Sequence, residues 1–256
     1  MALYIAHLAD HEYRPATVST AMSALSFVHK LRGLPDPTNT FLIHKMLKGF
    51  QKLSPNPICR LPITLGILKQ LLLALPSVLN SRYAVTMYKA MFLLAFHACL
   101  RVGEITAKPG QDHNLHVGDV NFCTYPKPQR TSLFITFRSY KHSKQNQIST
   151  LEVVDHVETS PVSTLHHYLQ MRGPHQGPLF SWQDRMPVSY TQFRDTLKAA
   201  LSFAGFSTSQ YKSHSFRIGR ATLALEQGMS ELQVMKLGRW SSTAHLRYLA
   251  PPSLSS

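Results

Sequence analysis

The segment "SHSFRIGRATLALEQGMSELQVMKLGRWSSTAHLRYLA" (Ser213–Ala250) carries His214, Arg217, Trp240 and Tyr248 in that order. The first two are three residues apart, so on a helix their side chains point to one side. Tyr248 follows the Gly-Arg-Trp triplet at a short distance and precedes two prolines. An H-x-x-R pair alone is usually a surface pair. An imidazole, a guanidinium and a phenol brought together indicate chemistry on a phosphate, whose oxygens match the planar fork of arginine.

A second arginine suited to phosphate lies far upstream, in "ACLRVGEI" (Ala98–Ile105). The nine residues before Arg101 include only one strongly polar residue, His97. An arginine in such surroundings is costly to bury without a partner, and Glu104, one helical turn later, can orient it. The alternative is a purely structural arginine–glutamate pair within a helix.

The charge and cysteine content of the chain limit its class. Its 256 residues include 27 Lys and Arg against 13 Asp and Glu, a net charge of +14. This excess predicts a polyanionic partner, namely nucleic acid. The alternative is a soluble protein with a basic surface. The three cysteines, Cys59, Cys99 and Cys123, are far apart and form no C-x-x-C pair, which argues against a disulfide framework or a structural zinc site.

No segment of the sequence predicts a membrane anchor or a leader peptide. The apolar run "AMFLLAFHACL" (90–100) is too short to span a bilayer and contains a histidine. The N-terminal "MALYIAHLADHEYR" becomes polar and acidic too early for a signal peptide. We therefore expect a soluble intracellular protein without a membrane partner.

Residues 1–55 are predicted to form a helical unit. One helix is expected over 15–33, where apolar residues recur at helical spacing between a proline and a glycine: Val18, Met22, Leu25 and Val28. A second is expected over 38–53, and its basic residues are spread along it: Lys45, Lys48 and Lys52. These lysines indicate either a solvated basic face or a bundle that follows a DNA backbone.

The segment "SPNPICRLP" (54–62) contains three prolines and no periodicity, so we interpret it as a linker. The second unit, 63–256, is expected to begin with a helix capped by Thr64, followed by a longer helix over 81–106. Residues 108–129 are expected to form a loop.

The runs "SLFITFRSY" (132–140) and "QISTLEVV" (147–154) predict a β-hairpin with a basic tip. Four helices should follow, each ended by a glycine: Gly173, Gly205, Gly228 and Gly238. The predicted fold is therefore mainly α with one small antiparallel sheet.

In combination, these motifs resemble the tyrosine recombinase (phage integrase) family, whose signature is H-x-x-R, then His or Trp, then Tyr. "CLRVGEI" is similar to the L-R-x-x-E motif of that family. "RLPIT" (60–64) and the closing segment resemble most the recombinases of eukaryotic DIRS and Crypton mobile elements. The stretch over 16–38 resembles the helical, SAM-like core-binding domain of that group. The resemblance implies a DNA-binding domain over 1–55 and a catalytic domain over 63–256.

The resemblance also implies a role for each motif residue. Arg101 and Arg217 would clamp the scissile phosphate, and His214 would assist proton transfer at the nucleophile. Trp240 can donate one hydrogen bond from its indole N–H. Tyr248 would attack and leave a 3′-phosphotyrosine and a free 5′-hydroxyl. Because that ester conserves the bond energy, neither ATP nor a metal cofactor is required.

The family's general acid is a lysine on the β-hairpin, where this chain has Lys141 and Lys144. Lys141 is favoured because it directly follows the strand, and Lys144 stays an alternative. Arg138 lies in the same stretch, which lacks acidic residues from 120 to 151 and is typical of a loop that enters a DNA groove. Lys212 and Arg239 flank the motifs and are candidate phosphate contacts.

The activity implied is DNA recombination and integration by a homo-tetramer on two synapsed duplexes, in the nucleus of a eukaryote or otherwise in the cytoplasm. Two alternatives are a domesticated, catalytically silent DNA-binding protein and a type IB topoisomerase, which shares the chemistry. The chain ends eight residues after Tyr248, whereas many family members continue into a helix that docks on a neighbouring subunit.

Overall fold

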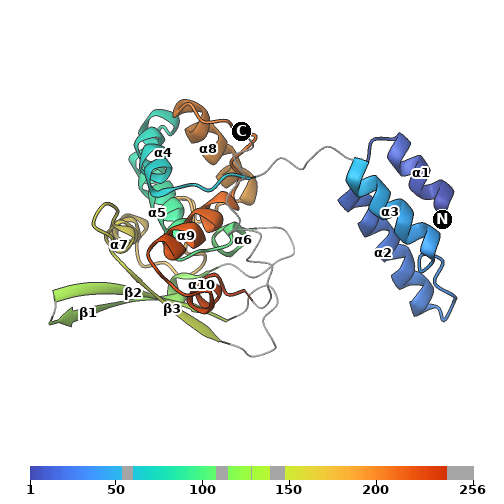
Figure 1. The fold of residues 1–256 in the computed structure, drawn as a ribbon. Helices are drawn as coiled ribbons and strands as arrows, with labels where there is room; N and C mark the ends of the chain where they lie inside the picture. Colours follow the sequence, from blue (N-terminus) through green and yellow to red (C-terminus); the bar gives the residue numbers. More distant parts are fainter. Residues whose placement is uncertain (54–59, 108–114, 128, 139–147, 241–256) are drawn as a thin grey trace. The chain divides into compact units, whose positions relative to one another are not determined.

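The computed structural model describes residues 1–53, 60–107, 115–127, 129–138 and 148–240. It is mainly helical with one three-stranded antiparallel sheet, which confirms the predicted fold class (Figure 1). The chain divides into two compact units, Met1–Ile58 and Cys59–Ser256. Their functional assignment stays a prediction. Among the described residues, no helix is both long enough and apolar enough to cross a membrane.

The first unit consists of α1 (Ala2–Asp10), α2 (Pro15–Leu31) and α3 (Phe41–Leu53). Helix α2 begins at its proline, which fits the first turn because an N–H there would lack a helical partner in any case. The three helices share a small core: Ile5, Leu8, Val18, Met22 and Ile43. Leu25 packs at the edge of this core, while Val28 is exposed, so the apolar face of α2 ends one turn earlier than predicted.

The second unit is built around α5 (Arg82–His97), of which twelve of the sixteen residues are buried. It packs against α4 (Leu65–Val78), α7 (Pro161–Arg172) and α9 (Ser215–Glu226), and α4 also packs against α8 (Tyr190–Phe203). The predicted cap of α4 is confirmed, because the Thr64 hydroxyl accepts a hydrogen bond from the N–H of Ile67.

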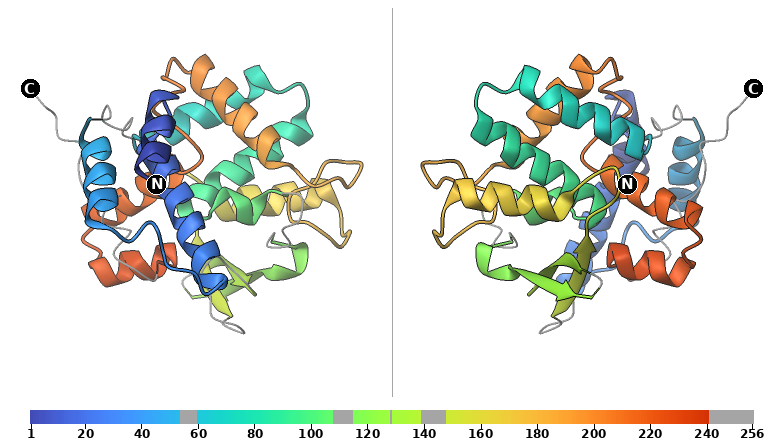
Figure 2. Two further views of the ribbon diagram at one scale, coloured as in Figure 1. Left: turned by 90° about the vertical axis from the view of Figure 1, so that its right-hand side faces the viewer. Right: turned by 90° about the vertical axis from the view of Figure 1, so that its left-hand side faces the viewer.

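The sheet contains β1 (Val120–Pro126), β2 (Gln129–Phe137) and β3 (Ser149–Val154), in that order. A 3-10 turn, η1 (Val117–Asp119), leads into β1. In Figures 1 and 2 the sheet lies on one side of α5, with α4 and α8 on the other. Alternate residues of β2 face the core and are buried, which confirms the predicted alternation: Leu133, Ile135 and Phe137.

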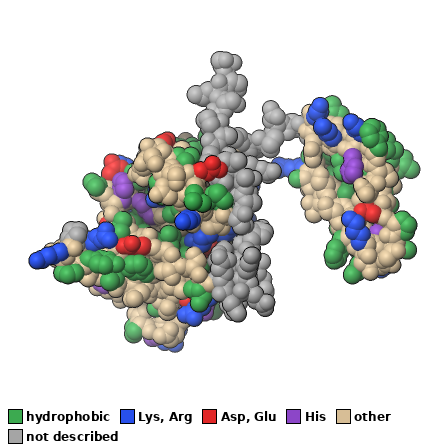
Figure 3. All heavy atoms as spheres, turned by 60° about the horizontal axis from the view of Figure 1, so that its bottom comes forward, with side chains coloured by type: hydrophobic (Ala, Val, Ile, Leu, Met, Phe, Trp, Pro, Cys, Tyr) green, Lys and Arg blue, Asp and Glu red, His purple; other side chains and the backbone are tan. Residues whose placement is uncertain are grey.

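Strand β1 falls in the stretch that was predicted to be a loop, so that prediction is wrong. It pairs with β2 from Val120 opposite Ile135 to Pro126 opposite Gln129. As an edge strand, its side chains are only partly buried or exposed. Because no face of β1 is fully buried, its sequence does not show the strict apolar alternation that predicted β2. Lysine and arginine side chains gather at the tip of the β1–β2 hairpin, where Lys127 and Arg130 are exposed (Figure 3).

Two helix ends differ from the prediction. The expected long helix over 81–106 is broken: α5 stops at His97, and a short α6 (Val102–Ile105) follows. Helix α10 (Glu231–Gly238) ends on Arg239, which adopts the left-handed conformation (φ +51°) in place of Gly238. Three helices do end as predicted, beside left-handed glycines: Gly173, Gly205 and Gly228.

Candidate functional site

Arg101 is positioned by a backbone turn between α5 and α6. Cys99 adopts a left-handed conformation (φ +49°), which ends α5 and redirects the chain. Arg101 is the residue before α6, and its N–H donates to the Glu104 Oε2 atom at 2.8 Å. Arg101 and Glu104 therefore face each other across a helix start, rather than along the continuous helix that was predicted.

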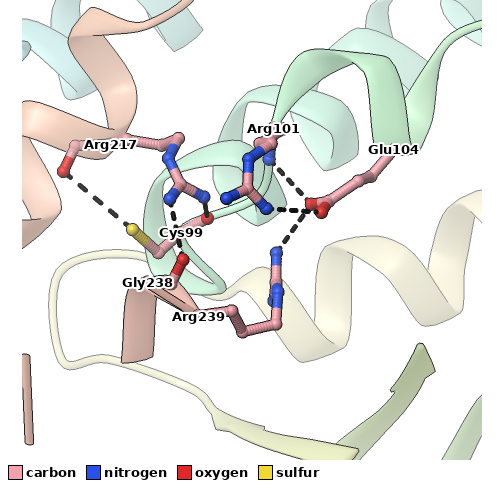
Figure 4. Close-up of polar contacts among 6 residues, drawn as sticks. All are labelled: Cys99, Arg101, Glu104, Arg217, Gly238 and Arg239. Atoms are coloured by element: carbon pink, nitrogen blue, oxygen red, sulfur yellow. Dashed lines mark hydrogen bonds and ion pairs between the residues drawn. The ribbon is translucent and has the colours of Figure 1, made fainter. Parts of the chain in front are cut away.

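The Glu104 carboxylate is shared between two arginines (Figure 4). Its Oε1 accepts from the Arg101 Nη1 at 3.3 Å, and its Oε2 accepts from the Arg239 Nη2 at 2.6 Å. The side chains of Glu104 and Arg239 are only 6% and 4% exposed, so their ion pair is shielded from water, whereas Arg101 is 23% exposed. Removing one member of such a pair is costly, because it leaves the other charge buried without a partner.

Arg217 is the most deeply buried charged residue of the site, with 1% of its surface exposed. Its Nη1 donates to the carbonyl oxygen of Cys99, and its Nη2 donates to the carbonyl oxygen of Gly238 at 2.7 Å. Its guanidinium also lies 4.7 Å from the centre of the Trp240 ring, a cation–π distance. A single side chain thus connects α9 to the turn before Arg101 and to the end of α10 (Figure 4).

His214 is the residue that precedes α9. Burial lowers its pKa from 6.5 to about 4, and the positive charges of Arg217, Arg60 and Arg101 act in the same direction. The imidazole is therefore neutral near pH 7 and can accept a proton. The predicted H-x-x-R pair is not a surface pair: it stands at the buried start of α9.

Arg239 lies at the centre of the cluster. Its side chain is 4% exposed, and its guanidinium stacks 3.8 Å above the Phe137 ring, at the end of β2. Burial lowers the pKa of Arg239, and Glu104 opposes that shift. Arg239 is therefore buried rather than a surface charge, and its contact with a DNA phosphate stays a prediction.

The sequence model of the phage integrase family matches residues 68–251, well over half of the chain. This chain belongs to the phage integrase family. No curated protein matches it. The family is that of the tyrosine recombinases, so the family-level resemblance noted from the motifs is confirmed.

Solved integrase and recombinase structures share the fold of this integrase-family chain. XerH site-specific recombinase bound to difH substrate is 16% identical, with a TM-score of 0.55 over 75% of this chain and 51% of that chain. A lambda integrase dimer bound to a COC′ core site is 15% identical, with a TM-score of 0.62 over 100% of this chain and 65% of that chain. A single-substitution variant of the Tn1549 transposon integrase in complex with a circular intermediate DNA is 11% identical, with a TM-score of 0.67 over 100% of this chain and 81% of that chain. The chain thus spans about half the length of the XerH recombinase.

Six of the fourteen predicted site residues come together in the described part of the fold. The cluster contains Arg101, Glu104, His214, Arg217, Arg239 and Trp240. Three predicted residues lie outside the described residues: Lys141, Lys144 and Tyr248. Within the described ranges, no group of three or more His, Cys, Asp or Glu residues can hold a metal ion.

The remaining basic candidates are all exposed. Lys212 lies just before α9, and Arg138 is 73% exposed and pairs with Asp119 at 2.8 Å. On α3 the predicted lysines follow an i, i+3, i+7 spacing and form one exposed face, which we call the α3 lysine face: Lys45, Lys48 and Lys52. Whether these residues bind DNA stays a prediction.

Sequence reasoning missed two backbone positions of the site, Cys99 and Gly238. Their carbonyl oxygens accept the hydrogen bonds of Arg217. A Cβ added to Gly238 would overlap the Trp240 ring, so this glycine allows the indole to pack against α10. Its position two residues before Trp240 is the one feature of the sequence that could have identified Gly238.

Proposed function

We propose that this chain is a site-specific DNA recombinase that cleaves and rejoins strands through a 3′-phosphotyrosine at Tyr248. The observation that carries the proposal is the link between the two motif arginines. Although 116 positions separate them, Arg217 donates to the carbonyl oxygen of Cys99, two residues before Arg101. Three buried or half-buried guanidinium groups and one carboxylate give this cluster a net charge of +2. Surplus positive charge in a shielded site favours an anionic group such as a phosphodiester.

In the proposed reaction, the Tyr248 phenol oxygen attacks the scissile phosphorus, and the bond from phosphorus to the 5′ oxygen breaks. Neutral His214 takes the phenol proton, and Lys141 gives a proton to the departing 5′ oxygen. Arg101 and Arg217 stabilise the charge on the non-bridging oxygens, and the Trp240 indole N–H donates one further hydrogen bond. Rejoining is the reverse reaction with another 5′-hydroxyl.

The motifs "RLPIT" and "GRW" support placement with the recombinases of eukaryotic DIRS and Crypton elements. On that assignment the protein acts in the nucleus, as a homo-tetramer on two synapsed duplexes. The exposed basic residues then contact backbone phosphates: Lys45, Lys48, Lys52, Arg138 and Lys212.

One observation favours a second candidate, a domesticated DNA-binding protein without catalysis. Both Nη atoms of Arg217 donate to backbone carbonyls. An arginine engaged in this way has a structural role in addition to any role in binding a ligand. Such a protein would keep the fold and the basic surface and lose strand exchange.

A nicked suicide duplex separates these candidates. When cleavage releases a short 5′-hydroxyl fragment, the covalent intermediate cannot rejoin and accumulates. A panel of inverted-repeat duplexes should yield an adduct with the unaltered chain and none with Tyr248→Phe. Binding without an adduct would instead identify the silent DNA-binding protein. Relaxation of supercoiled plasmid without strand exchange would identify a topoisomerase.

The same assay identifies the general acid. A 5′-bridging sulfur leaves as a thiolate without protonation, so it bypasses the acid. Lys141→Ala should therefore be slow on ordinary DNA and fast on the sulfur-containing substrate. The same pattern for Lys144→Ala alone would assign the role to Lys144.

A further inference from the structure

The proposed reaction assigns no role to Arg239, a buried arginine. Its Nη2 donates to Glu104 at 2.6 Å, and its guanidinium covers the Phe137 ring. Its Nε and Nη1 are buried and have no hydrogen-bond partner among the described residues. Burying an arginine with unpaired donors is costly, so its presence in the site calls for an explanation.

The contacts of Arg239 join three parts of the site. Glu104 belongs to α6, directly after Arg101, and Phe137 is the last residue of β2. Arg239 itself follows α10 and precedes Trp240. One guanidinium therefore joins the start of α6, through Glu104 (Figure 4), to the end of β2, through the Phe137 ring.

Sharing of the Glu104 carboxylate has an electrostatic consequence. If Arg101 were its only partner, the carboxylate would neutralise the guanidinium that is to meet the phosphate. The contact with Arg239 is the shorter of the two side-chain pairs, 2.6 Å against 3.3 Å. The positive charge of Arg239 thus offsets that of the carboxylate, so Glu104 can orient Arg101 while the cluster keeps a surplus positive charge.

We propose that Arg239 is a positioning residue, which acts through Glu104 to aim Arg101 at the scissile phosphate and to preserve its charge. The inference rests on the proposed recombinase function. Its side chain is 4% exposed and donates to Glu104, so in this proposal it acts on the reaction through that carboxylate.

The test compares single-turnover adduct formation with DNA affinity for Arg239→Met and Arg239→Lys. We expect Arg239→Met to slow adduct formation about a hundredfold while the DNA dissociation constant stays within about threefold. Arg239→Lys should recover about tenfold of the lost rate because it keeps the charge. Arg194→Met, which removes an exposed arginine of α8, is the matched control and should change neither quantity. A loss of affinity that matches the loss of rate would overturn the proposal.

Dependence on Glu104 is tested by combining the variants. In a Glu104→Gln background, Arg239→Met should slow adduct formation by less than about threefold further. Both changes remove the same Arg239–Glu104 ion pair, so their effects should not multiply. A substrate with a neutral methylphosphonate at the scissile position should also shrink the Arg239→Met defect at least about tenfold, since less charge develops there. Losses that multiply, or an equal defect on both substrates, would show that Arg239 acts independently or only supports the fold.

Unfolding in urea keeps the two proposals separable. If the unaltered chain forms no adduct, the recombinase function fails, and the Glu104–Arg239 coupling is then judged from unfolding alone. The unfolding constant of the double variant should differ from that expected for independent changes by about tenfold or more. A difference below about twofold would overturn the coupling.

Discussion

The Nη2 atom of Arg217 donates a hydrogen bond to the carbonyl oxygen of Gly238 at 2.7 Å, which connects α9 to the last turn of α10. Its Nη1 atom donates to the carbonyl oxygen of Cys99. The two accepting residues precede Arg239 and Arg101 by one and two positions. The arginine proposed to clamp phosphate therefore also holds together the backbone turns that present the other two arginines.

This double use predicts that Arg217→Met costs stability as well as activity. The free energy of unfolding should fall by about 3 kcal/mol, because two buried carbonyl oxygens lose their donor. Arg194→Met should change it by less than about 0.5 kcal/mol. Urea unfolding measures both variants, and equal effects would show that the buried contacts contribute little.

Two tightly packed glycines, Gly219 on α9 and Gly238 at the end of α10, should respond differently to alanine. A Cβ on Gly219 would overlap the backbone carbonyl of Ile63, which cannot move aside, whereas a Cβ on Gly238 would meet the Trp240 side chain. We expect Gly219→Ala to lower the free energy of unfolding by about 2 kcal/mol or more. Gly238→Ala should lower it less and mainly slow adduct formation, by displacing the indole from Arg217. Thermal unfolding and the adduct assay together check this order, and the reverse order would refute it.

Buried histidines predict a loss of stability in mild acid. Burial, with help from Arg220, lowers the pKa of His97 from 6.5 to about 3, and the pKa of His214 falls to about 4. Between pH 6.5 and 4 the unfolded chain binds these protons and the native chain does not. The free energy of unfolding therefore decreases as the pH is lowered through this window, by up to about 1.4 kcal/mol per pH unit for each group.

His97→Gln tests this dependence on one group. The amide can keep the hydrogen bond to the Thr159 hydroxyl, which His97 makes at 2.8 Å, and it does not titrate. Urea unfolding from pH 4.5 to 6.5 should give a flatter slope for the variant. Parallel slopes for the two chains would contradict the assigned pKa.

Neutralisation of the α3 lysine face should weaken DNA binding without changing sequence preference. Each phosphate contact contributes about 0.9 to the slope of log K against log salt. Replacing Lys45, Lys48 and Lys52 by Gln should therefore reduce that slope by about 2 to 3. Lys30→Gln, on α2 beside Asp36, is the matched control. An unchanged slope in the triple variant would show that the face is only solvated.

The parts of the fold that follow local rules could be predicted from the sequence. The Thr64 cap, the apolar alternation in β2 and the glycines after α7, α8 and α9 each depend on residues close in the chain. The order of the motifs also indicated which distant segments would meet. These signals sufficed for the fold class and for most members of the cluster.

The errors arise where a distant contact overrides local preference. The sequence from Ala98 to Leu100 is compatible with a helix, yet Cys99 turns left-handed, with its carbonyl held by Arg217, 118 residues away. Arginine is usually exposed, but Arg239 is buried because it forms an ion pair with Glu104, 135 residues away in the sequence. Neither partner can be identified from residues near these positions.

The measurement that tests the central claim most directly is the site and polarity of the covalent bond. The adduct from a nicked duplex is digested with nuclease and protease, and the linked peptide is sequenced by mass spectrometry. The account predicts a nucleotide 3′-phosphate on the Tyr248 oxygen and a free 5′-hydroxyl on the released strand. A phosphate on any other residue, or a 5′-phosphate on the released strand, would contradict it.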